Sequence, residues 1–139
     1  MTEDNRRTAI AQEVRHGRNA LRAAESLRDL GLHNDALDRL YYGLFHHVLA
    51  LLMIEGVEPR RHGSLAGLLG QHVVGKHELT AADVAVVSRA YAARDLADYE
   101  RTWDADKKTV VASFGEVVPL IERIQRYLAA SGWLSPDEG

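Results

Sequence analysis

The chain has 139 residues, a formal net charge of -3 at pH 7 and no cysteine. This length supports one domain with a single hydrophobic core, so we expect one domain over residues 1–139 with its core at about 5–130. The absence of cysteine excludes disulfides and thiolate metal ligands, and the slight acidity gives no reason to expect sequence-independent nucleic-acid binding. The N-terminal residues carry no signal-peptide pattern, so we expect a cytoplasmic protein.

The first predicted element is a long amphipathic helix over residues 3–30. Its apolar positions recur at steps of three or four, the repeat of an α-helix. They include Ile10, Val14, Leu21 and Ala24. Gly31 follows where a C-terminal cap is expected, and Asn34 can cap the start of the next helix. The connection is therefore short, which predicts antiparallel neighbours.

The second predicted helix, at residues 37–55, has large apolar or aromatic side chains on every face and no permanent charge between Arg39 and Glu55. A helix without a polar face must be surrounded by other elements. It is too short to span a membrane, and we expect no membrane partner. A bundle of this size has too few helices to cover it completely, so we expect a homodimer. Gly56 and Pro59 end the helix.

Three more helices follow. A short one should start near Gly63 or Ser64 and stop before Gly75. The next should begin at Ala81, because Thr80-Ala81-Ala82-Asp83 has the spacing of a capping box with Asp in place of Glu. Its inward positions, at steps of three and four, are Val84, Val87, Tyr91, Arg94 and Asp98. Two opposite charges therefore occupy positions that the helical repeat assigns to the interior.

The last helix should follow a cap at Asp104 or Asp106 and run to about Ala130. Its apolar repeat is Val110, Phe114, Val117, Ile121, Ile124 and Leu128. The repeat keeps its phase across Pro119, which predicts one bent helix rather than two. Since no β-strand alternation stands out, the sequence predicts an all-α, up-and-down bundle of four long helices plus one short helix.

Arg94 and Asp98 have the spacing of an intrahelical ion pair. One interpretation is a structural pair, and the other is a site where the guanidinium binds a phosphate or nucleotide. Tyr99 can add a hydroxyl or a stacking surface. Tyr42, Phe45 and His46 lie on the most apolar helix, where we expect them to serve in the core or in a subunit contact.

The remaining histidines give weaker signals. His62, beside Arg61 at the entry of the short helix, can contact an anion or belong to a solvated loop. His72 and His77 are five residues apart across a helix end, which is not the spacing that places two ligands on one helical face. We therefore expect no metal site and no cofactor.

Four stretches together resemble the HEPN superfamily, named for higher eukaryotes and prokaryotes nucleotide-binding, and most closely its small stand-alone prokaryotic members. They are Tyr41-Tyr42-Gly43-Leu44-Phe45-His46, Arg61-His62-Gly63-Ser64-Leu65, Gly75 and Arg94-Asp95-Leu96-Ala97-Asp98-Tyr99. The resemblance implies an up-and-down bundle, usually a homodimer. It also implies action with a minimal nucleotidyltransferase as a toxin–antitoxin pair, in which the toxic members are metal-independent ribonucleases.

The resemblance further implies that ribonucleases of this family pair an arginine with a histidine four to six residues later. Arg94 falls at the arginine position, but Asp98 and Tyr99 follow it and no histidine occurs after His77. A carboxylate there would neutralise Arg94 instead of assisting proton transfer. His62 can replace the missing histidine if the fold brings it near.

Arg28 and His33 also have this spacing, but they fall at the end of the first helix and its turn, and we interpret that match as chance.

Three functions remain open. The favoured one is a non-cleaving module that binds a nucleotide, RNA or the nucleotidyltransferase through Arg94, Asp98, Tyr99 and Arg61. The second is a metal-independent endoribonuclease that uses Arg94 with His62 as catalytic residues on an RNA substrate. The third is a non-catalytic dimerisation bundle in which the Arg94–Asp98 pair fixes the following loop.

Overall fold

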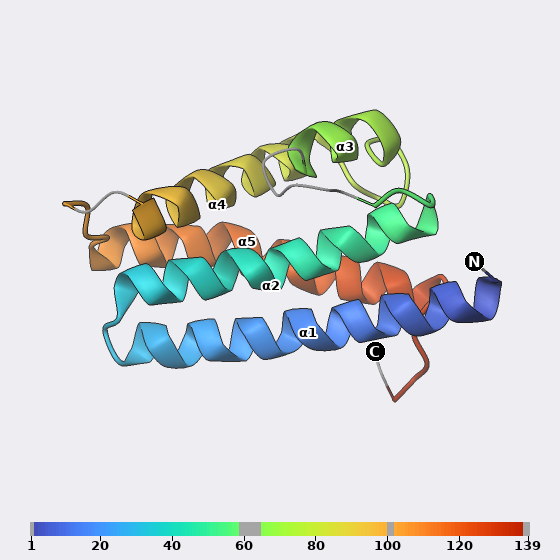
Figure 1. The fold of residues 1–139 in the computed structure, drawn as a ribbon, viewed down its shortest axis with the longest axis horizontal. Helices are drawn as coiled ribbons and strands as arrows, with labels where there is room; N and C mark the ends of the chain where they lie inside the picture. Colours follow the sequence, from blue (N-terminus) through green and yellow to red (C-terminus); the bar gives the residue numbers. More distant parts are fainter. Residues whose placement is uncertain (1, 59–64, 100–101, 138–139) are drawn as a thin grey trace.

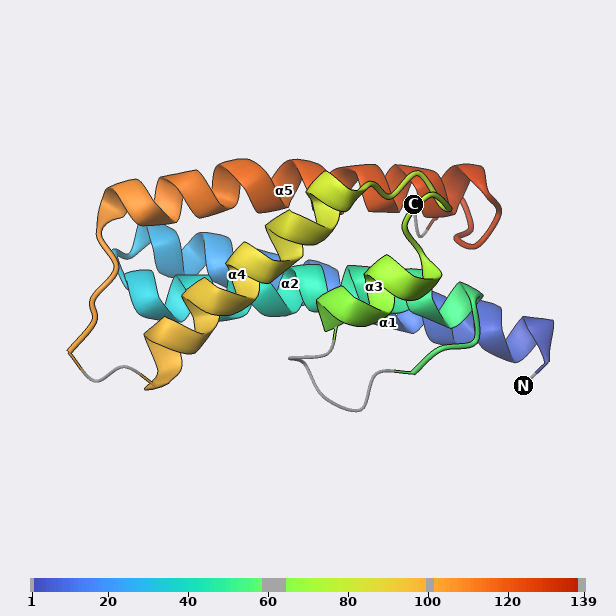
Figure 2. The same cartoon turned by 90° about the horizontal axis from the view of Figure 1, so that it is seen from above.

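The computed structural model describes residues 2–58, 65–99 and 102–137, and these contain five helices. They are α1 (Glu3–Asp29), α2 (His33–Ile54), α3 (Leu65–His72), α4 (Ala81–Tyr99) and α5 (Lys107–Ala130). Successive long helices run in opposite directions, with α1 and α2 side by side and α4 crossing obliquely over the others (Figures 1 and 2). The predicted all-α bundle of four long helices and one short helix is confirmed.

Helix α2 is the central element of the bundle, since it packs against α1, α3, α4 and α5. Its fully buried large side chains are Leu37, Leu40, Tyr41, Leu44, His47, Leu51 and Leu52. One stripe of α2 is covered only in part within the single chain. It consists of Tyr42, Phe45, His46, Leu49 and Met53, which recur at helical spacing and are all half-buried. We call this set the open stripe of α2.

The helix ends follow the local sequence signals, with one exception. Asp83 N–H donates to Thr80 Oγ1 at 3.2 Å and Thr80 N–H donates to Asp83 Oδ2 at 3.0 Å, so the capping box that starts α4 is present. Asp106 caps α5 by accepting from Thr109 N–H at 2.7 Å. Helix α5 continues through Pro119 as one element.

The exception is the start of α2, where the predicted cap at Asn34 is wrong. Leu32 is the N-cap residue, and it makes no side-chain cap bond. Asn34 lies inside the helix, and its amide donates to Trp103 O at 3.0 Å and accepts from Ala105 N–H at 2.9 Å. Its side chain therefore ties the α4–α5 connection to α2.

A glycine allows α1 and α2 to approach closely. A Cβ atom on Gly17 would lie 2.5 Å from Nδ1 of His47, whose side chain is fully buried. His47 Nδ1–H donates to Gly43 O at 2.6 Å, and its Nε2 lies 2.9 Å from Nε2 of Gln125, the donor. Burial lowers the pKa of His47 to about 4, so this histidine is neutral inside the bundle.

No helix in the described residues is long and apolar enough to cross a bilayer.

Candidate functional site

The predicted site arginine lies where α4 crosses the first half of α2. Helical spacing on α4 puts Arg94 and Asp98 on one face, and the same spacing on α2 puts Asp38 and Tyr42 on the facing side. Tyr99 completes the group at the end of α4. We call these residues the Arg94 cluster: Asp38, Tyr42, Arg94, Asp98 and Tyr99.

The guanidinium of Arg94 is held on several sides. Its Nε lies 3.0 Å from Oδ2 of Asp98 and 3.3 Å from Oδ1 of Asp38. Its Nη2–H donates to the Tyr42 hydroxyl at 3.0 Å. The side chain of Arg94 is only 14% exposed, whereas Tyr99 is 70% exposed, with its ring centroid 5.7 Å from the guanidinium carbon. Arg94 is therefore a fixed, half-buried group beside an exposed aromatic ring.

The two carboxylates of this cluster face two guanidinium groups, because Nε of Arg39 lies 3.5 Å from Oδ2 of Asp38, so the charges balance when all four groups are ionised. Partial burial and the neighbouring Asp38 carboxylate raise the pKa of Asp98, although Arg94 opposes this shift. Partial burial by itself would lower the pKa of Arg94, but Tyr42, Asp38 and Asp98 raise it, so the arginine keeps its charge. Both carboxylates contact Nε of Arg94, and the Tyr42 hydroxyl accepts from Nη2, so an incoming phosphate would compete with these groups for the guanidinium.

The structure brings several of the predicted site residues together. Arg94, Asp98, Tyr99 and Tyr42 lie together in one cluster. Arg61 and His62 lie outside the described residues, so their proposed role next to Arg94 stays a prediction.

His46 lies on the open stripe of α2 but contacts α1 and not Arg94. Its Nδ1 lies 2.7 Å from Oε2 of Glu13, and the His46 ring centroid is 5.6 Å from that of His16. The side chains of His46 and Glu13 are 25% and 22% exposed. Phe45, the third residue expected in the core or in a subunit contact, packs against the Tyr41 and Tyr42 rings.

Sequence reasoning missed Asp38 and Glu13. Asp38 lies four residues before Tyr42 and so on the same face of α2, which is a signal that the sequence does contain. Glu13 had no comparable signal, because it lies 33 residues from His46 on a helix whose outer faces carry many charges. Within the described part of the chain, no three His, Cys, Asp or Glu side chains are grouped so that they could hold a metal ion.

Comparison with known proteins gives a family match and several relatives. The family model described as HEPN domain matches residues 12–127. A protein of Methanocaldococcus jannaschii named "Putative toxin MJ0142" is 24% identical over 83% of this chain and 78% of its own length. "Putative toxin MJ0605" of the same organism is 26% identical over 78% of this chain and 80% of its own length.

"UPF0332 protein PH1297" of Pyrococcus horikoshii is 31% identical over a shorter segment, which covers 47% of this chain and 46% of that protein. The family match reaches from α1 to α5 and contains the whole Arg94 cluster.

Proposed function

The chain belongs to the HEPN family, and from this premise we propose that it is the HEPN component of a toxin–antitoxin pair, acting in the cytoplasm with a minimal nucleotidyltransferase. In this proposal the Arg94 cluster recognises the partner protein and does not cleave RNA. Two relatives that carry the name "Putative toxin" support the toxin-like part of the proposal.

One observation carries the choice of a non-cleaving role. The Arg94 guanidinium is shared between two carboxylates, Asp38 and Asp98, at 3.3 and 3.0 Å. Phosphate binding by arginine depends on donors that are free of competing carboxylates and on a positive local charge. Both carboxylates compete for Nε of Arg94 and the Tyr42 hydroxyl accepts from Nη2, whereas an exposed Tyr99 beside a fixed arginine is typical of residues that dominate protein–protein binding.

The proposal includes a homodimer. The open stripe of α2 presents aromatic and aliphatic side chains that one chain covers only in part. A second copy packed on the stripe would bury them and would bring two Arg94 clusters to one assembly, because Tyr42 belongs to both the stripe and the cluster.

Co-purification with the nucleotidyltransferase of an adjacent reading frame tests the proposal. We expect Arg94→Ala and Tyr99→Ala to weaken this association by about tenfold or more, because they remove the fixed charge and the exposed ring. Arg89→Ala is the matched control, since Arg89 lies on the same helix and its ion pair with Glu116 is on the surface. An adjacent frame that encodes no nucleotidyltransferase, or equal weakening in all three variants, would overturn the proposal.

A second candidate, the metal-independent endoribonuclease, is favoured by the His46–Glu13 pair. A carboxylate 2.7 Å from Nδ1 orients an imidazole and leaves Nε2 as a base. His46 follows Tyr42 by one helical turn, so a substrate on the open stripe of α2 can meet both residues. RNA cleavage by the parent chain that is lost in Arg94→Ala and in either His46→Ala or His62→Ala would establish this candidate. An Arg94→Ala chain that mainly fails to fold would favour the structural bundle.

A further inference from the structure

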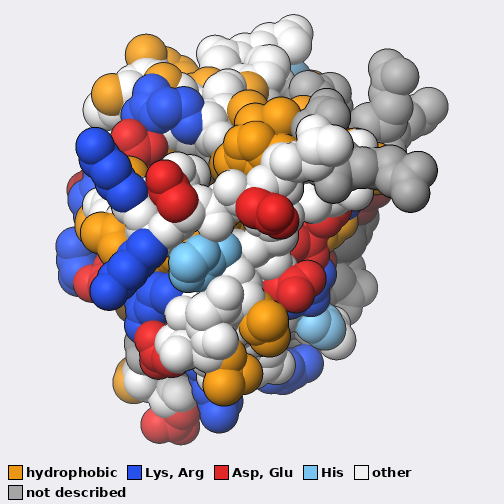
Figure 3. Space-filling view, turned by 90° about the vertical axis from the view of Figure 1, so that its left-hand side faces the viewer, with side chains coloured by type: hydrophobic (Ala, Val, Ile, Leu, Met, Phe, Trp, Pro, Cys, Tyr) orange, Lys and Arg blue, Asp and Glu red, His pale blue; other side chains and the backbone are white. Residues whose placement is uncertain are grey.

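A cavity of about 610 Å³ lies at the end of the bundle where α1 stops and α2 and α5 start. Its basic lining residues are Arg28, His33 and Lys107, and its apolar ones are Val110, Val111 and Phe114. In Figure 3, which looks onto this end of the molecule, lysine and arginine side chains lie mainly toward one side, with aspartate and glutamate side chains among them. None of the lining residues belongs to the Arg94 cluster.

The charge of this cavity is opposite to that of the chain. Arg28 and Lys107 are positive and Asp29 is the acidic lining residue, so the lining has a net positive charge even with His33 neutral. The whole chain carries -3. A local positive charge on an acidic protein attracts an anion to that place, and the size of the cavity falls within the roughly 300–1,000 Å³ of small-molecule sites.

Arg28 is already fixed in the orientation that an anion needs. Its Nε–H donates to Asp29 Oδ1 at 3.0 Å, and its guanidinium carbon lies 4.7 Å from the centroid of the Phe114 ring. The side chain is 35% exposed. The bond to Asp29 uses the inner edge of the guanidinium, which leaves the edge with two terminal amino groups for a bidentate anion.

The cavity also has an apolar side. Val111, 57% exposed, is the open part of this side, whereas Val110 and Phe114 are already covered at 1% and 6% exposed, with the Arg28 guanidinium over the Phe114 ring. An inorganic anion would leave this apolar area in water, but a ligand with an aromatic or aliphatic body would cover it. The combination of a cationic edge and an apolar wall therefore selects a ligand that has both an anionic group and an apolar body.

Backbone groups can add to the anion-binding side. α2 begins at His33 and α5 at Lys107, so two helix N-termini lie at this cavity, although the Asp106 carboxylate already caps that of α5. The N-cap residue of α2, Leu32, has no side-chain oxygen to occupy the first amide groups of that helix. The negative end of α1 is shielded, because Gly31 N–H and Leu32 N–H bond to its last carbonyls.

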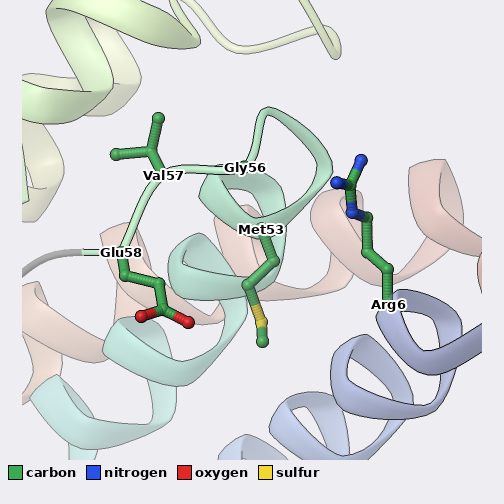
Figure 4. A pocket seen from close by; sticks show the side chains of 5 residues that line it. All are labelled: Arg6, Met53, Gly56, Val57 and Glu58. Carbon is green, nitrogen blue, oxygen red and sulfur yellow. The ribbon is translucent and has the colours of Figure 1, made fainter. Parts of the chain in front are cut away.

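Two other cavities lack this combination. The one of about 320 Å³ at the opposite end is lined by Arg6 and Glu58, which lie on either side of Met53 in Figure 4, so its charges cancel. A third, of about 380 Å³, has Arg7 and Arg15 but only Ala11 as an apolar wall.

From these observations we infer that the cavity between α1, α2 and α5 binds a phosphate monoester carried on an aromatic or apolar body. Arg28 holds the phosphate through its terminal amino groups, Lys107 neutralises the second negative charge, and the body of the ligand rests on Val111. The site is independent of the proposed role of the Arg94 cluster, so either can fail without the other.

Titration of the full chain with phenyl phosphate, followed by calorimetry and by amide chemical shifts, tests the inference. We expect saturable binding, with the shifts concentrated at residues 28–33 and 107–114. Inorganic phosphate should bind about tenfold more weakly, because it covers no apolar surface. A nucleoside 5′-monophosphate, compared with a 5′-phosphorylated oligonucleotide, distinguishes a free ligand from the end of a nucleic acid.

Charge-removing variants complete the test. Arg28→Gln should weaken phenyl phosphate binding by about tenfold or more and Lys107→Gln by a few-fold, because the lysine is a single, more hydrated charge. Arg15→Gln is the matched control and should bind as the parent does. The inference is overturned if phenyl phosphate gives no saturation, if inorganic phosphate binds equally well, or if Arg15→Gln weakens binding as much as Arg28→Gln. Circular dichroism of each variant verifies that it is folded.

Discussion

At the scale of single residues, Gly17 is needed for the close packing of α1 against α2, although it lies in the interior of a helix. Alanine normally improves a helix interior, but a Cβ at this position would meet His47 Nδ1 at 2.5 Å and Gly43 O at 3.1 Å. We expect Gly17→Ala to lower the free energy of unfolding by about 1–3 kcal/mol because the α1–α2 contact must open. Gly115→Ala in α5, where no atom lies within 4 Å, should instead be neutral or stabilising by up to about 1 kcal/mol. Denaturant unfolding of both variants checks this, and equal effects would contradict it.

His47 makes the stability of the protein depend on pH. Its pKa is about 4 in the folded chain and near 6.5 when unfolded, so between these values the unfolded state binds a proton that the folded state does not. The stability contributed by neutral His47 is therefore present above pH 6.5 and is lost as the pH falls toward 4. At about pH 5 the loss is about 2 kcal/mol relative to neutral pH. A His47→Gln chain should show a smaller drop in unfolding free energy over this range, and an unchanged drop would assign the effect to other groups.

At the scale of helices and their connections, the Asn34 side chain joins the start of α2 to the α4–α5 connection through two hydrogen bonds. Asn34→Ala removes two hydrogen bonds, at 3.0 and 2.9 Å, and should cost about 1–3 kcal/mol. Asn34→Asp keeps an acceptor for Ala105 N–H and should fall between alanine and the parent. Hydrogen exchange at Ala105 N–H should speed up most in the alanine variant. Unchanged exchange there would mean that the His33 contact to Ala105 O holds the connection alone.

The helices were predictable because their signals are local, and the site was only partly predictable because its contacts are not. The Thr80–Asp83 box and the Arg94–Asp98 spacing each lie within one turn, where the period of the helix determines which side chains meet. Asp38 joins Arg94 across 56 residues and Asn34 joins Ala105 across 71, so only the packing of α2 against its neighbours reveals these pairs. The contact between His47 and Gly17 could not be predicted from the sequence either, because it depends on how closely α1 and α2 approach each other.

At the scale of the whole molecule, the polar features are unevenly placed around α2. The Arg94 cluster lies on the side facing α4, the His46–Glu13 pair on the side facing α1, and the open stripe runs between them. The cavity inferred above to bind a phosphate monoester is lined by residues at the end of α1 and at the starts of α2 and α5. These helix ends lie at one end of the bundle (Figure 1). A second chain on the open stripe would thus leave that cavity accessible while it covers the aromatic residues next to Arg94.

The open stripe gives the sharpest test of the proposed homodimer. Leu49 lies in the middle of the open stripe and is half-buried. Leu49→Glu therefore places a charge where a second copy would exclude water. In a single chain, water can still reach the new carboxylate. We expect the parent to have the light-scattering mass of two chains at micromolar concentration and Leu49→Glu to have the mass of one, with an unchanged helical circular dichroism spectrum. Val111→Glu also introduces a glutamate, at a residue that is 57% exposed near the start of α5, and should remain dimeric. A parent that is monomeric under these conditions would remove the homodimer from the proposed function.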